Sequence, residues 1–200
     1  MMRNLLAMAV VAAGLMVGGC DTMQSEHHDH AAMMADSGHA AMHASMWASV
    51  TRATATIYPT KGNQVSGTLM FDKVADAVHI HGTITGLEPN STHAMHIHDF
   101  GDQSSDDGTA AGSHYNPEAH PHADVTATTR HAGDLGNIKA DGTGKATVDL
   151  TVNNITLADM KNPVIGRGVV IHAKVDDFSQ PVGNAGARLG VGVIGIAKGQ

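Results

Sequence analysis

Short segments in which apolar and polar residues alternate recur along the chain. In residues 77–84, Val78 and Ile80 alternate with His79 and His81, a pattern typical of a strand with one buried face. The two histidines share the polar face of this strand. The pattern therefore favours a solvent-exposed pair of histidines over an accessory metal site.

Composition supports an all-β interpretation. Glycine is abundant, with 23 residues, while aromatic residues make up only 3% of the chain. Turn signals such as Lys61-Gly62-Asn63 and Asp141-Gly142 separate the alternating segments. These features predict a sandwich or barrel of short strands rather than a helical protein. The 200 residues, less an N-terminal leader, suffice for one domain of about 150 residues with a single core.

A series of histidines carries the candidate chemistry. In His96-Ile97-His98, the period of two sends both imidazoles to one face and Ile97 to the other, toward a core. Further along the chain follow His114, His122, His131, Asp134 and His172. Neutral imidazole suits copper and zinc, and a carboxylate added to three histidines suits zinc. The series therefore predicts a site for two metal ions.

Residues 95–198 resemble the copper/zinc superoxide dismutases. The resemblance rests on HIHDFGD (96–102), AGSHYNP (111–117), RHAGDLGN (130–137), IGR (165–167), VIHAK (170–174), GNAGAR (183–188) and GVIGIA (192–197). It implies that residues 46–200 form an all-β domain, an eight-stranded Greek-key β-barrel (an immunoglobulin-like sandwich) with long metal-binding loops. It also implies conversion of superoxide to dioxygen and hydrogen peroxide, with one copper and one zinc per subunit.

The resemblance assigns a ligand set to each metal. The copper ligands would be His96, His98, His114 and His172, and the zinc ligands His114, His122, His131 and Asp134. His114 would bridge the two ions and take a proton during turnover. His120 remains an alternative to His122, although only His122 falls eight residues after His114 as the family pattern asks.

Two further residues match supporting positions of the family. Asp176 corresponds to the carboxylate that links one copper histidine, here His96, to one zinc histidine, here His122. Arg188 corresponds to the arginine beside the copper, whose fork of donors would dock superoxide. A structural pairing of Arg188 with the acidic loop is the alternative. His93 has no ligand counterpart in the family, and we expect it at the surface.

The N-terminus predicts export. Residues 1–19 combine Arg3 with an apolar run over 5–17, which is typical of a signal peptide and short for a membrane span. Val17-Gly18-Gly19-Cys20 resembles a bacterial lipobox, so we expect lipid modification of Cys20 and anchoring of the exported protein to a membrane of the cell envelope or periplasm. A plain signal peptide is the alternative. Cys20 is the only cysteine, which excludes an intramolecular disulfide.

A low-complexity linker rich in histidine and methionine occupies the rest of residues 20–45. Its candidate copper ligands are His27, His28, His30, Met33, Met34, His39, Met42 and His43. Imidazoles bind copper(II) and thioethers prefer copper(I), so the linker is either a plain tether or a copper-collecting arm. A partner protein that donates copper is compatible with both interpretations.

The sequence departs from the family in two respects. The family's disulfide positions are Gly108 and Val191 here, so packing, hydrogen bonds and the zinc site must hold residues 102–113. The segment of residues 176–188 is shorter than in the eukaryotic members of the family. It also lacks the lysine that helps to steer the anionic substrate in those members. The formal charge is −7, and Asp106 and Asp107 fall near the expected rim. Lys139, Lys161 or Lys174 could offset them, and we expect slower, salt-sensitive turnover.

These observations favour an enzyme, a superoxide dismutase. The alternative is a non-catalytic lipoprotein of the cell envelope that buffers or delivers copper and zinc. The acidic chain lacks a basic aromatic patch, so nucleic-acid binding is not expected. A monomer and a homodimer both remain compatible with the sequence.

Overall fold

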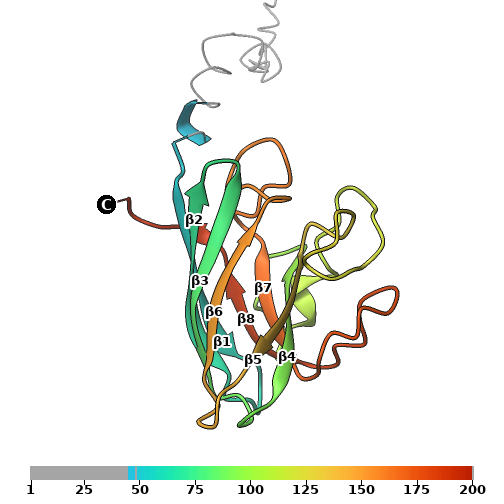
Figure 1. Ribbon diagram of the computed structural model, residues 1–200. Helices are drawn as coiled ribbons and strands as arrows, with labels where there is room; N and C mark the ends of the chain where they lie inside the picture. Colours follow the sequence, from blue (N-terminus) through green and yellow to red (C-terminus); the bar gives the residue numbers. More distant parts are fainter. Residues whose placement is uncertain (1–44, 48, 200) are drawn as a thin grey trace, which may run out of the picture.

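The computed structural model describes residues 45–47 and 49–199 (Figure 1). The expected signal peptide, Cys20 and nearly all of the linker lie outside these residues. Within them, the chain forms β1 (Arg52–Pro59), β2 (Ser66–Val74), β3 (Ala77–Thr85), β4 (Thr92–His98), the 3-10 turn η1 (Thr109–Ala111), β5 (Asp134–Lys139), β6 (Ala146–Val152), β7 (Gly168–His172), β8 (Arg188–Val193) and β9 (Gly195–Ile196).

The strands form one antiparallel sheet in the order β5-β4-β7-β8-β1-β2-β3-β6, with the short β9 added beside β1. The two ends of this order approach each other through an isolated bridge between Ala140 and Ala146, so the sheet is a nearly closed barrel. The chain crosses the barrel from β3 to β4 and from β6 to β7, where consecutive strands are not neighbours. The expected eight-stranded, all-β barrel is confirmed.

Alternating side chains build the core from β1, β2, β3 and β6. On β3, Val78, Ile80 and Ile84 are buried while the residues between them are not, as the sequence pattern predicts. Leu69 and Phe71 of β2 point to the same interior. Because one face of these strands is buried, their register is strongly specified.

Strands β4 and β7 are buried on both faces. Ile97 packs in the hydrophobic core, as expected, while His96 and His98 point to the other side of β4. Two long connections cover that side, namely residues 99–133 between β4 and β5 and residues 173–187 between β7 and β8 (Figure 1). The barrel is thus a rigid base on which these two loops enclose polar side chains.

Hydrogen bonds and close packing hold the loop of residues 102–113. A side chain added at Gly108 would begin 2.8 Å from Cγ2 of Val191, so these two positions are adjacent in space. Gln103 donates from Nε2 to the Val191 carbonyl at 2.6 Å, and the Lys61 amide donates to the Asp106 carbonyl at 2.8 Å. Polar contacts therefore occur where the family resemblance suggests a covalent bridge.

No helix in the described part of the chain is long and apolar enough to cross a membrane.

Candidate metal centre

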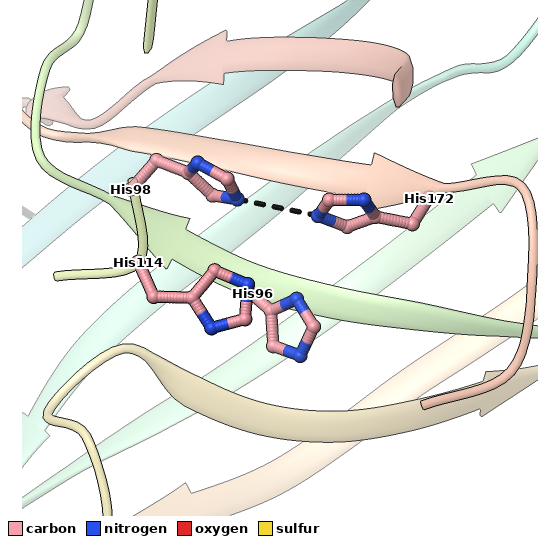
Figure 2. Close-up of side chains that lie close together, drawn as sticks. All are labelled: His96, His98, His114 and His172. Atoms are coloured by element: carbon pink, nitrogen blue, oxygen red, sulfur yellow. Dashed lines mark hydrogen bonds between the residues drawn. The ribbon is translucent and has the colours of Figure 1, made fainter. Parts of the chain in front are cut away.

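Four buried histidines meet on the outer side of β4 (Figure 2). His96 and His98 come from β4, His172 ends β7, and His114 is placed beside His98 by an isolated backbone bridge. One ring nitrogen of each lies within 4.8 Å of those of the others. The structure therefore brings together the four residues that the sequence assigns to copper.

Hydrogen bonds determine which ring nitrogen of each histidine faces the centre of this cluster. His98 donates from Nδ1 to the Gly112 carbonyl at 3.0 Å, and His172 donates from Nδ1 to the Gly186 carbonyl at 3.3 Å. Their Nε2 atoms are consequently left facing each other, 3.2 Å apart (Figure 2). His96 donates from Nε2 to Asp176, and its buried Nδ1 has no hydrogen-bond partner. Three lone-pair nitrogens thus converge.

A second cluster surrounds the carboxylate of Asp134, the first residue of β5. The Nδ1 atoms of His122, His131 and His114 lie 2.8, 3.2 and 3.4 Å from its Oδ1. The other oxygen, Oδ2, accepts the backbone N–H groups of Ala123 and His131 at 3.1 and 3.0 Å. Three imidazoles and one carboxylate are the ligand set of a four-coordinate zinc site.

Asp176 joins the two clusters. Its Oδ2 accepts a hydrogen bond from His96 Nε2 at 2.7 Å, and its Oδ1 accepts one from His122 Nε2 at 2.9 Å. All three side chains are fully buried. A carboxylate in this position fixes both rings and leaves the Nδ1 atom of each directed into its own cluster.

Burial controls the protonation of the first cluster. Burial and the neighbouring histidines depress the pKa of His98 well below its usual value. For the same reasons, the pKa of His114 falls from 6.5 to about 4 and that of His172 to about 3. Imidazoles that stay neutral at physiological pH keep the lone pairs that a metal requires.

In the second cluster, the charged forms of the side chains are favoured instead of the neutral forms. Burial opposes ionisation of Asp134, but the three imidazoles around its Oδ1, of which His122 donates a hydrogen bond, outweigh it and lower the carboxyl pKa. Burial likewise opposes protonation of His122, yet Asp134 and Asp176 raise its pKa to about 9. A cation can replace that proton between the same groups.

The donor atoms of both clusters fit metal ions. The Nδ1 atoms of His96, His114 and His131 are buried side-chain nitrogens without a hydrogen-bond partner. Such orphaned polar atoms are costly in a native protein unless an ion or water completes them. The all-imidazole set suits copper, and the set that contains Asp134 suits zinc.

Arg188 lies beside the first cluster at the start of β8. Its two terminal nitrogens donate to the carbonyls of Gly108 and Gly112, each at 2.6 Å. It lines a pocket of about 170 Å³ together with His98, His114 and His172. Both donors are thus committed to backbone carbonyls of the loop over residues 102–113, which is the structural pairing with the acidic loop that the sequence left open as the alternative. The guanidinium is held at the entrance to the histidines.

The lysines proposed for steering lie in different surroundings. The side chain of Lys174 lies against Gly186, which lines the Arg188 pocket. Lys161 lines another pocket together with Lys73 and Ile155. A further lysine, Lys61, pairs with Asp106 at 2.7 Å. Salt-sensitive turnover remains a prediction.

His93 corrects one expectation, because it is buried rather than at the surface, with 4% of its area exposed. It donates from Nδ1 to the carbonyl of His172 at 2.8 Å, and its Nε2 lies 2.6 Å from Ser91 Oγ. His93 therefore holds the backbone of His172 in place through this hydrogen bond. Sequence reasoning failed here because a missing ligand role does not imply exposure.

The sequence did not reveal the supporting role of several other residues. The side-chain amide of Asn137 clamps the backbone of Asp176, with its Oδ1 accepting the amide at 2.7 Å and its Nδ2 donating to the carbonyl at 3.0 Å. Gln180 makes a similar pair of bonds to the backbone of His122. Gly183 has no room for a side chain, since one would collide with Asp176. These contacts join loops far apart in the sequence.

His120 lies outside both clusters. Its Nδ1 donates to the Arg130 carbonyl at 3.2 Å, and its backbone is held by Asn116. We therefore expect His120→Asn to retain one zinc per chain and His122→Asn to lose it. Of these two histidines, only His122 contacts Asp134. Metal content after dialysis measures this, and equal zinc loss from the two variants would refute the assignment.

The metal-free chain should be most stable near pH 6.5–7. Because the pKa values of His114 and His172 fall from 6.5 to about 4 and about 3, the unfolded state binds more protons below pH 6.5, and stability falls as the pH falls. His122, with a pKa of about 9, acts in the other direction, and its contribution is lost as the pH rises through 9. Each proton contributes a slope of about 1.4 kcal/mol per pH unit. Urea unfolding of the chelated chain across this range tests the maximum.

Comparisons with known proteins agree with this geometry. The family described as copper/zinc superoxide dismutase (SODC) matches residues 65–194. The Cu-Zn superoxide dismutase of Neurospora crassa is 41% identical over 145 residues, which cover 68% of this chain and 93% of the relative. That of Paramecium bursaria Chlorella virus 1 is 40% identical over 156 residues, covering 74% and 82%. The crystal structure of the clock protein EA4 matches with a TM-score of 0.68 at 37% identity and covers 74% of this chain and 95% of that one.

Proposed function

We propose that this chain, which belongs to the copper/zinc superoxide dismutase family, converts two superoxide ions and two protons to dioxygen and hydrogen peroxide. The observation that carries the proposal is the pocket in which Arg188 lies beside His98, His114 and His172. A small anion that enters this pocket meets a cation and a cluster of neutral imidazoles.

The chain's own residues divide the work. Bound copper would supply one-electron redox chemistry between His96, His98, His114 and His172, while zinc would neutralise Asp134 and orient the rings of the second cluster. Arg188 would orient the anion, since its guanidinium is already fixed by Gly108 and Gly112. His114 Nδ1 faces Asp134, so its Nε2 is the atom that would hold a proton and pass it to the reduced product.

The test is the dismutation rate of the mature chain loaded with one copper and one zinc, beside the variant His172→Asn. We expect turnover in the loaded wild type and loss of turnover and copper in the variant, because His172 supplies one of the three converging nitrogens. Stoichiometric metal without turnover in the wild type would instead identify a protein that buffers or delivers copper and zinc.

We also propose that the protein is exported and lipid-anchored through Cys20. Support comes from the apolar run over residues 5–17 and from Val17-Gly18-Gly19-Cys20. Labelled palmitate should be incorporated into the wild type and not into Cys20→Ser, which should leave the membrane fraction. Equal labelling of both proteins would refute the anchor.

The linker suggests a role in copper loading. Deleting residues 24–45 should slow copper uptake at limiting metal, because these residues carry five histidines and three methionines. The activity of the fully loaded protein should be unchanged. Copper content over time measures the rate, and unchanged loading would reduce the linker to a tether.

A further inference from the structure

A second group of histidines and carboxylates lies on the outer face of the barrel, away from the buried clusters. His79 and His81 project from β3 between the inward-facing Val78 and Ile80. The strands on either side, β2 and β6, present Asp72 and Asp149. The register sets His79 opposite Asp72 and His81 opposite Asp149. None of these four residues belongs to β4, β7 or the loops that form the metal centre.

The four side chains contact one another closely. The two imidazoles stack with their centroids 4.9 Å apart and their planes 19° apart. His81 donates from Nε2 to Asp72 Oδ2 at 2.9 Å, and His79 donates from Nε2 to Asp149 Oδ1 at 2.8 Å. One ligand atom from each of Asp72, His79 and His81 lies within 4.8 Å of the other two.

The spacing of these atoms suits a metal ion with tetragonal coordination. Two ligands at a right angle, with bonds of about 2.0 Å each, are roughly 2.9 Å apart, which matches the separation of each imidazole nitrogen from its carboxylate oxygen. Tetragonal sites with nitrogen and oxygen ligands are typical of copper(II), which also has the highest affinity among the divalent first-row ions.

The charges also favour a cation. Arg52 donates from Nε to Asp72 Oδ1 at 2.8 Å, which orients the carboxylate and leaves Oδ2 on the side of the histidines. Hydrogen bonds from His81 and Arg52 overcome the effect of burial and lower the pKa of Asp72, so the group is an anion at neutral pH. The carboxylates of Asp72 and Asp149 outnumber the single guanidinium of Arg52.

We propose that His79, His81 and Asp72, with Asp149 at the edge, form a surface site for one copper(II) ion in addition to the buried metal centre. The side chains of His79 and His81 are 34% and 38% exposed, so the ion keeps open positions for water and exchanges with the solvent. Three paired strands carry the ligands, which holds their backbones in place without the metal. The sequence pattern alone favoured a plain exposed pair, because it did not reveal the two carboxylates.

The first test is equilibrium dialysis of the full mature chain, with copper and zinc already in the buried centre, against copper(II). The double variant His79→Asn/His81→Asn should bind one copper ion fewer per chain than the wild type. The N-terminal linker is the same in both proteins, so its copper cancels in the comparison. Thr151→Asn, a change on the same outer face opposite His79, is the matched control and should bind as many ions as the wild type. Equal copper binding by the wild type and the double variant would overturn the proposal.

A second measurement needs no variant. Copper(II) is paramagnetic, so adding less than one equivalent to the ¹⁵N-labelled, metal-loaded wild type should broaden the backbone amide signals of residues 79–81, Asp72 and Asp149. Signals of the β4–β7 half of the barrel should change little. Unchanged signals in β2, β3 and β6, with broadening only in the N-terminal linker, would show that the four side chains form hydrogen bonds alone.

Discussion

We expect that stripping both copper and zinc lowers the melting temperature of this protein by roughly 16–32 °C, the sum of two ions. An ion present at 1,000 times its dissociation constant stabilises the native state by about 4 kcal/mol, and each kcal/mol shifts the melting point of a domain of this size by roughly 2–4 °C. Chelation leaves the carboxylate of Asp134 facing three buried imidazoles. It also removes the link between the loop of residues 99–133 and β5.

The loss should exceed that of relatives that carry a disulfide in this loop. Such a bridge contributes about 2–4 kcal/mol and remains after chelation. Here Cys20 is the only cysteine, and the contacts of Gln103, Lys61 and Arg188 take the place of the bridge. Calorimetry of loaded and chelated protein, beside a disulfide-bearing relative, measures the difference. Equal shifts in the two proteins would contradict this expectation.

Replacing Arg188 with alanine should reduce the dismutation rate roughly 10- to 100-fold. A hydrogen bond to a charged group contributes about 1.5–3 kcal/mol, and each 1.36 kcal/mol corresponds to a factor of ten in rate. The guanidinium is the cation that lines the pocket with His98, His114 and His172. Its removal takes away both the local charge and the fork of donors that would orient the anion.

Two further variants separate these effects. Arg188→Lys keeps the charge without the fork and should retain intermediate activity, since lysine cannot bond Gly108 and Gly112 together. Lys145→Ala removes one positive charge in the turn between β5 and β6 and serves as the control for net charge. Copper and zinc contents must match the wild type in every variant. An Arg188→Ala protein with full metal and full activity would exclude Arg188 as the docking residue.

The elements of the fold that depend on local pattern could be predicted from the sequence. The alternation in residues 77–84 specifies which side of β3 is buried, because successive side chains of a strand point to opposite faces. The same rule places Ile97 in the core and its two histidine neighbours outside it. The motif resemblance also identified the residues that meet in both clusters, because ligands spaced along the chain can be recognised without coordinates.

Tertiary structure alone decided what depends on contacts between distant segments. Which nitrogen of each histidine faces the metal centre is determined by carbonyls and a carboxylate from other loops, such as Gly112 for His98 and Asp176 for His96. His93 was wrongly placed at the surface, since its burial follows from packing under the backbone of His172. His79 acquires Asp149 as a neighbour only through the pairing of β3 with β6, strands that are separated in the sequence by β4 and β5. One strand's pattern specifies a face, but the residues that meet on that face are specified by the register of the whole sheet.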